Sequence, residues 1–138
     1  MTNQDIGPRY LTLLILWFAI CVSIGLFLVI IYFAGTNAAG NPSLSLILES
    51  ATVVPFAVSF LAKQLLLGKA VAEQNIDKVQ PAYVMAFALS EASALLGLLD
   101  RFLNGSKYFY IGFILAGLGM LFHFPQQRHL RAAAGQEF

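Results

Sequence analysis

The feature that most constrains this sequence is a run of 25 residues, from Tyr10 to Ala34, that contains no charged side chain. About 20 apolar residues are enough to cross the hydrocarbon core of a bilayer as an α-helix. A cleavable signal peptide is the competing interpretation, but its apolar region is only about 7–15 residues long. The run therefore predicts a helix that spans a membrane.

Three further apolar segments follow this run, and shorter, more polar stretches separate them. Of all residues, 59% are hydrophobic and only 11% are charged, whereas soluble domains are roughly one quarter charged. We expect a single all-α domain over residues 1–138 that is embedded in a lipid bilayer as an antiparallel four-helix bundle. Its predicted spans cover residues 10–34, 44–67, 82–103 and 107–124.

Local signals refine these boundaries. Ser43 is a plausible N-cap for the second helix, because its hydroxyl can accept a backbone hydrogen bond in the first turn. The polar stretch 68–80 is expected to be a connecting loop, and the tail that follows Pro125 is expected to be solvated surface. Pro125 itself is expected to end the fourth span, since proline lacks the backbone N–H that a helix interior needs.

Basic residues are distributed unevenly between the two sides of this bundle. Six lie toward the side that holds both termini: Arg9, Lys63, Lys69, Lys78, Arg128 and Arg131. The other side holds only Arg101 and Lys107. Because positively charged residues stay in the cytoplasm, we expect a multi-pass protein of the bacterial cytoplasmic (inner) membrane with both termini inside.

Several functional classes lack support in the sequence. The net charge of +1 gives no basic patch for nucleic acid, and no zinc, haem-attachment or nucleotide-binding spacing occurs. The single cysteine, Cys21, cannot form an intrachain disulfide. Hydrolytic chemistry needs a nucleophile beside a base or a metal, and the two histidines have no such neighbours in the sequence. We therefore expect neither an enzyme nor a metal site.

Glu91 lies near the centre of the third span, where an ionisable group costs at least ~2.5 kcal/mol. Two interpretations remain open: a protonated carboxyl that donates a hydrogen bond to a neighbouring helix, or a site for ion binding together with Ser90 and Ser93. Glu49 of the second span lies roughly 8 Å from the outer helix end, while Glu91 lies roughly 18 Å from it. These two carboxyl groups are therefore not expected to share a proton directly.

Two further patterns concern helix packing. A polar stripe runs along one face of the second span: Ser45, Glu49, Thr52, Ser59 and Lys63. Small residues share a face in the third span (Ala86, Ser90, Ser93 and Gly97) and in the fourth (Gly112, Ala116 and Gly119). Small residues let helices approach closely in membranes, so we expect these two spans to form a tight hairpin.

His123 follows Gly112, Ala116 and Gly119 on the same face of the fourth span. A neutral imidazole is a common axial ligand of haem, and the small residues would leave a slot for a flat macrocycle. Haem or chlorophyll binding through His123 is therefore one hypothesis, although a second histidine ligand within the membrane is lacking. A hydrogen-bonded residue near the helix end is the alternative.

The third span also shows a local resemblance to a known family. Lys78, Gln80-Pro81, Ser90-Glu91-Ala92 and Gly97-Leu98 resemble the polar loop and carboxylate helix of the proteolipid, or c, subunit of rotary ATP synthases. This resemblance implies that Glu91 binds a proton or a sodium ion.

The whole chain is similar to small bacterial four-helix membrane proteins in its Glu91-Ala92 pair, its Phe124-Pro125 stop and the following Arg128. That likeness implies an accessory role. We accordingly expect a non-catalytic accessory or assembly subunit of a larger membrane complex, respiratory or photosynthetic, which contacts other transmembrane helices. A homo-oligomer would use the same surfaces.

Overall fold

The computed structural model describes residues 6–35, 38 and 40–136, and within them it contains five α-helices, one short 3₁₀ helix and no β-strand. In chain order these are α1 (Ile6–Ala34), α2 (Pro42–Ala72), the 3₁₀ helix η1 (Ile76–Lys78), α3 (Val79–Asn104), α4 (Tyr110–Phe122) and α5 (Gln127–Ala133). The all-helical class that the sequence predicts is confirmed for this part of the chain.

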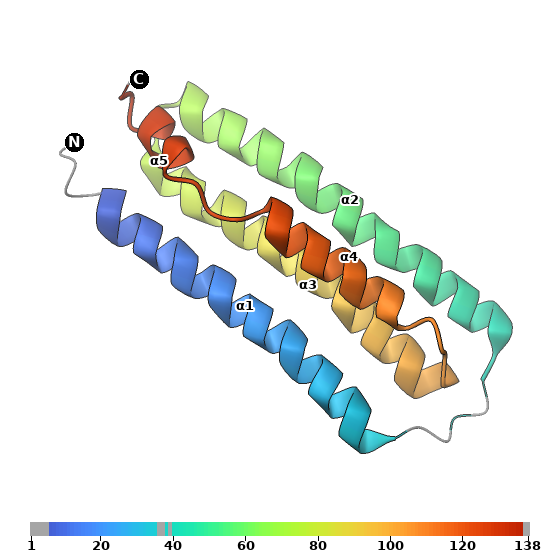
Figure 1. The fold of residues 1–138 in the computed structure, drawn as a ribbon. Coiled ribbons are helices and arrows are strands. Elements are labelled where there is room, and N and C mark those ends of the chain that lie inside the picture. Colours follow the sequence, from blue (N-terminus) through green and yellow to red (C-terminus); the bar gives the residue numbers. More distant parts are fainter. Residues whose placement is uncertain (1–5, 36–37, 39, 137–138) are drawn as a thin grey trace.

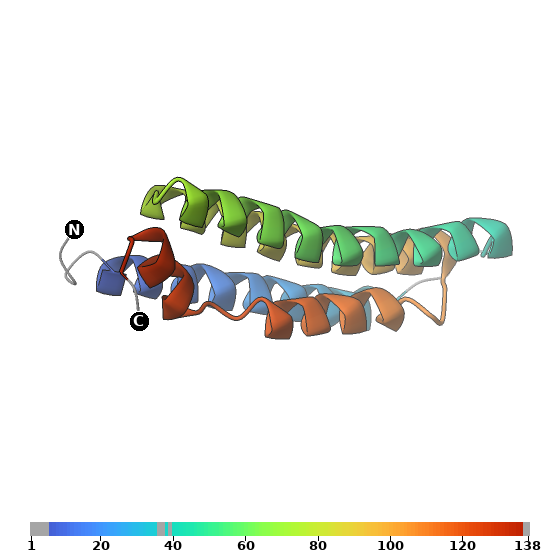
Figure 2. The same ribbon diagram turned by 90° about the horizontal axis from the view of Figure 1, so that it is seen from above.

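The four longer helices lie side by side, and each runs opposite to the one before it (Figure 1). Seen from above, α2 and α3 form one layer and α1 and α4 form the other (Figure 2). Helix α3 contacts each of the other α-helices. One end of the molecule, here called the tail end, holds the start of α1, the α2–α3 junction and α5 (Figure 1). The opposite end holds the end of α1, the start of α2 and the α3–α4 connection.

Three helical segments are long and apolar enough to cross a membrane: Ile6–Ala34, Pro42–Ala72 and Ile76–Asn104. Helix α4 is different, because its 13 residues extend only about 20 Å, against a hydrocarbon core of about 30 Å. Helix α4 is also shorter than the predicted span 107–124, by three residues at its start and two at its end. The helix ends at Phe122, which agrees with the prediction that Pro125 ends this span. The chain becomes helical again only in α5.

The other boundaries also differ from the prediction. Helix α2 continues through Ala72, so the first part of the expected loop 68–80 is helical, and η1 occupies part of the rest. The N-cap of α2 is Asn41, whereas the sequence predicts Ser43. Asn41 Oδ1 accepts hydrogen bonds from the backbone N–H groups of Ser43 (3.1 Å) and Leu44 (3.3 Å). Pro42 then occupies the first turn, where its missing N–H costs nothing.

Helices α3 and α4 approach closely through the small residues of the predicted hairpin. A Cβ atom built on Gly97 would lie 2.5 Å from the carbonyl oxygen of Phe109 and 3.4 Å from Gly112 Cα. A Cβ atom on Gly119 would lie 2.5 Å from Ser90 Oγ. Ala86 and Ala116 are also fully buried. Larger side chains at these contacts would push the two helices apart.

Helix α1 is attached more loosely than the others. Four of its residues are buried, Ile6, Leu13, Ile24 and Ile31, and most of its remaining apolar side chains are exposed. One specific bond joins it to α4: the Trp17 indole N–H donates to the carbonyl oxygen of Met120 over 2.8 Å. Most of the α1 surface is therefore free to contact lipid or another protein.

The tail after Pro125 packs against the rest of the protein, contrary to the expectation of solvated surface. Leu130 and Ala133 of α5 are buried, because their spacing puts both on one side of the short helix. The Tyr83 hydroxyl of α3 bonds to His129 over 2.6 Å. Helix α5 thereby closes the tail end over α3.

Candidate functional site

Glu91 lies at the middle of α3 and points toward α1. The Ser23 hydroxyl of α1 donates a hydrogen bond to Glu91 Oε1 over 2.5 Å. Both residues are only partly buried, and no second hydrogen bond to the Glu91 side chain is present among the described residues. The carboxyl group therefore lies at an open seam between two helices.

The two serines predicted to accompany Glu91 do not face α1: Ser90 faces α4 and Ser93 faces α2. Ser90 donates to the Ala86 carbonyl oxygen of its own helix over 2.9 Å. Ser93 donates across the interface to the Thr52 carbonyl oxygen of α2, also over 2.9 Å. Both are fully buried. The structure does not bring Ser90, Ser93 and Glu91 together into one group of ligands.

Glu49 belongs to a separate cluster at the end opposite the tail. Glu49 Oε1 accepts hydrogen bonds from Ser106 (2.7 Å) and from Ser45 (3.2 Å). The Ser45 hydroxyl also lies 3.0 Å from Asp100 Oδ2, and the Asn104 amide donates to Asp100 Oδ1 over 2.8 Å. Asp100 is fully buried. Hydroxyl and amide donors thus hold both carboxyl groups.

Arg101 follows Asp100 in the chain, but its guanidinium group bonds to backbone carbonyl groups. Arg101 Nη1 donates to the carbonyl oxygens of Gly105 (3.1 Å) and Ser106 (3.3 Å), and its guanidinium carbon lies 5.4 Å from the centre of the Phe109 ring. Arg101 therefore supports the C-terminal end of α3 and the turn after it. It forms no ion pair with Asp100 or Glu49.

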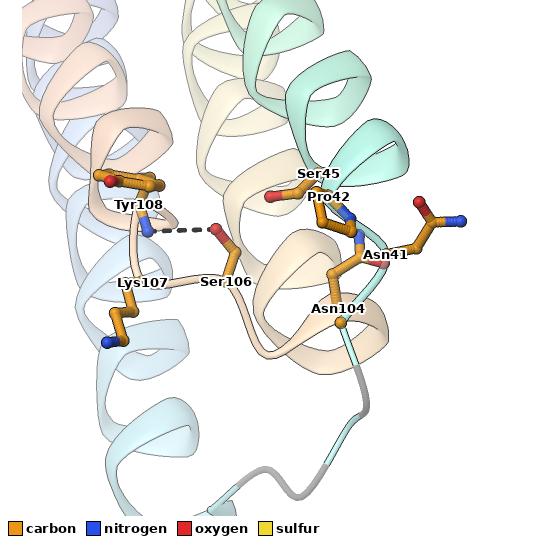
Figure 3. Close-up of a pocket in the computed structure, with 8 residues that line it drawn as sticks. Asn41, Pro42, Ser45, Asn104, Ser106, Lys107 and Tyr108 are labelled. Carbon is orange, nitrogen blue, oxygen red and sulfur yellow. Dashed lines mark hydrogen bonds between the residues drawn. The ribbon is translucent and has the colours of Figure 1, made fainter.

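A pocket of about 190 Å³ opens beside this cluster. Figure 3 shows Ser45, Asn104 and Ser106 at its wall, with the Lys107 side chain directed away from Ser45. Ser106 has two roles here, because its hydroxyl also accepts a hydrogen bond from the Tyr108 backbone N–H over 3.1 Å. The pocket thus borders the Glu49 cluster without adding another acidic group to it.

His123 is fully buried where α4 ends. Its Nε2 atom lies 2.8 Å from the Ser59 hydroxyl of α2, which itself donates to the Phe56 carbonyl oxygen over 2.6 Å. The hydroxyl proton is thereby used, so Nε2 of His123 is the donor to Ser59. Nδ1 is buried without a hydrogen-bond partner among the described residues.

This environment does not fit the macrocycle hypothesis. The space beside Gly119 is filled by Ser90 of α3, and Phe56 lies 3.6 Å from a Cβ atom built there. The Phe60 ring lies 4.6 Å, centre to centre, from the imidazole of His123. The slot that a flat cofactor would need is therefore occupied by side chains of the protein.

The break between α4 and α5 leaves backbone carbonyl groups that need partners. Two are supplied by other helices: Trp17 donates to Met120, and Lys63 Nζ of α2 donates to the carbonyl oxygen of Phe122 over 3.4 Å. A cation at the C-terminal end of a helix also interacts favourably with the helix dipole. Lys63, which was counted with the tail-end charges, thus stabilises the end of α4.

A second chain of hydrogen bonds fixes α5. The Gln126 backbone N–H donates to the Tyr83 hydroxyl over 3.0 Å, so the Tyr83 proton points to His129 Nδ1. Burial, together with the positive charges of Lys63 and Arg128, lowers the pKa of His129 to about 4. The imidazole therefore stays neutral at physiological pH and can accept this bond.

Sequence reasoning missed several of these partners. Asp100 and Asn104 continue the spacing of Ser93 and Gly97 along α3, at successive steps of three and four residues. This spacing was a usable signal that they face the interior. Ser23 gave no such signal, because α1 is apolar on all sides. The polar stripe of α2 faces α3 and α4, as the bonds of Ser45, Ser59 and Lys63 show.

Within the described ranges, no group of three or more His, Cys, Asp or Glu side chains is placed to hold a metal ion. Comparison of the chain with models of protein families, with curated proteins and with solved structures finds no match.

Proposed function

We propose that this protein is a non-catalytic subunit of a membrane complex, built as an antiparallel bundle of four helices with both termini in the cytoplasm. The three long apolar helices support the membrane location. The orientation is supported by the basic residues of the elements at the tail end, because basic residues stay on the cytoplasmic side. These are Arg9 of α1, Lys69 of α2, Lys78 of η1 and Arg131 of α5. Helix α4 and the break after it make the fourth crossing, and α5 lies at the cytoplasmic end. Irregular backbone at this depth is tolerated where protein buries it.

The observation that carries the proposal is the incomplete environment of Glu91. An ionisable group at the middle of a membrane helix normally faces the bundle interior or a partner. Glu91 instead lies at the α1–α3 seam with one hydrogen bond, from Ser23. Leu95, one turn further along α3, is 40% exposed. An additional helix packed on this seam would remove Glu91 from lipid.

The chemistry of the site restricts what this partner can be. A helix that lies against apolar side chains gains little from hydrophobicity in lipid, so polar and small residues direct its association. We therefore expect a transmembrane helix with a hydroxyl or amide side chain at the depth of Glu91. A protonated Glu91 would donate to it while accepting from Ser23.

Extraction in a mild detergent, followed by size determination and mass spectrometry, tests this proposal. We expect a particle that contains the 15.0 kDa chain together with at least one other membrane polypeptide. A homo-oligomer would keep the role of Glu91 but identify the partner as a second copy. A monomer that survives under the mildest extraction would refute the subunit proposal.

A second candidate function uses the same carboxyl group. The partial exposure of Glu91 leaves it accessible to a proton or sodium ion, as the likeness to ATP synthase proteolipids implies. The bundle supplies only the Ser23 hydroxyl as a bonded neighbour. Any further oxygen ligands of a sodium ion would therefore come from another chain.

A further inference from the structure

An apolar groove of about 600 Å³ lies on the outer surface between α2 and α3. Its walls include Val58, Ala62 and Leu65 of α2 and Met85 and Leu89 of α3, and Lys69 lies at its tail-end limit. No residue of α1, α4 or α5 lines it. This surface is therefore separate from the seam at Glu91.

The length of the groove matches one leaflet of a bilayer. From Val58 to Lys69 the helix advances 11 residues, or about 16 Å at 1.5 Å per residue. Half of a hydrocarbon core of about 30 Å is about 15 Å. An acyl chain that enters beside Lys69 and follows the groove would end near the middle of the membrane.

The positive charge of Lys69 at the tail-end limit of the groove favours anionic lipids over neutral ones. Lys69 is exposed in the last turn of α2, and among the described residues it forms no salt bridge. Glu73 lies one turn beyond and could compete for it, but Glu73 is held by Lys78. A free ammonium group at the membrane surface attracts anionic head groups.

We propose that this groove binds one chain of an anionic phospholipid from the cytoplasmic leaflet, with Lys69 at its phosphate. The inference rests on the membrane location proposed above but does not depend on any partner helix. It assigns a lipid site to the α2–α3 face, which leaves the α1–α3 seam for protein contacts.

Native mass spectrometry tests the site on protein released from nanodiscs that contain equal amounts of phosphatidylglycerol and phosphatidylcholine with identical acyl chains. We expect the full chain to retain phosphatidylglycerol about fivefold more than phosphatidylcholine, the preference that one basic residue gives near a membrane surface. Lys69→Gln should abolish this preference. Ala62→Phe should fill the groove and remove the bound lipid of either kind.

Ala57→Phe is the matched control, because it adds the same volume to an exposed position of α2 outside the groove. It should retain lipid as the unchanged protein does. Equal retention of both lipids by the unchanged protein, or an unaltered preference in Lys69→Gln, would overturn the inference. A dimer that dissociates in Ala62→Phe would assign the groove to a second copy instead. A monomer that still selects phosphatidylglycerol would refute the subunit proposal and leave the lipid site intact.

Discussion

The close contact between α3 and α4 predicts that Gly112 and Gly117, both in α4, respond differently to replacement by alanine. A Cβ atom built on Gly112 would lie 3.2 Å from Gly97 Cα and would collide with the carbonyl oxygen of Ser93. Both neighbours belong to backbone, which cannot move aside as a flexible side chain does. At Gly117 a Cβ atom would meet nothing within 4 Å.

Replacing either glycine by alanine gives the same gain in helix propensity, about 0.5–1 kcal/mol. This gain cancels when the two variants are compared. Overpacking in a close-packed interior costs typically about 1–3 kcal/mol, so Gly112→Ala should be less stable than Gly117→Ala by that amount. The same difference corresponds to roughly 5- to 150-fold in the folding equilibrium.

Unfolding in detergent micelles by increasing amounts of a denaturing detergent measures this difference. Trp17 is the only tryptophan, and its indole bonds to Met120 of α4. Its fluorescence therefore reports the packing of α4, while circular dichroism follows the helices themselves. Equal midpoints for Gly112→Ala and Gly117→Ala would refute the close α3–α4 contact on which the fold depends.

Two further predictions concern the tail end. Arg9 and Asp77 form a salt bridge of 2.6 Å, and their side chains are 34% and 69% exposed. Because exposed pairs contribute little to stability, Arg9→Gln should lower the free energy of unfolding by at most about 1 kcal/mol at low salt. Salt screens such pairs, so this loss should disappear in a titration to about 1 M salt. The pKa of His129 falls from 6.5 to about 4 on folding. As the pH is lowered, the unfolded chain therefore binds a proton at this residue before the folded chain does. The free energy of unfolding should decrease as the pH falls from 6.5 toward 4. His129→Gln should reduce this pH dependence in denaturation measured at several pH values, while an unchanged slope would exclude His129 as a source of it.

The helical content and the three long apolar segments were predictable from the sequence, because uncharged runs such as Tyr10–Ala34 leave few alternatives to a helix. The end of the fourth helix before Pro125 was predicted, but the return to a helix in α5 was not. Phe122 and Phe124 are as apolar as the helix before them, so hydropathy continues across the point where the backbone changes direction. Only the partners of the exposed carbonyl groups, Trp17 and Lys63, show how the break is stabilised.

The candidate site was predictable only in part. The central position of Glu91 follows from counting along α3, and the stripe containing Glu49 follows from helical periodicity. The Ser23 contact depends on how α1 is rotated about its own axis, and a helix that is apolar on every side carries no periodic signal for that rotation. Asp100 was not singled out in the sequence, although its spacing from Ser93 places it on the interior face.

Glu91 provides the most direct test of the central claim that the α1–α3 seam receives a partner helix. Glu91→Gln keeps a hydrogen-bond donor and should preserve assembly in mild detergent. Glu91→Leu removes it and should weaken association by about 1 kcal/mol. Glu73→Gln, which changes an acid outside the spans, is the control and should assemble normally.

The assembled size of these variants, measured beside proton and sodium flux in vesicles, decides between the two functions proposed for Glu91. The account predicts weakened assembly in Glu91→Leu alone, with no flux that depends on Glu91. Intact assembly in both Glu91 variants together with complete loss of ion flux in both would contradict it and would identify Glu91 as an ion-carrying group.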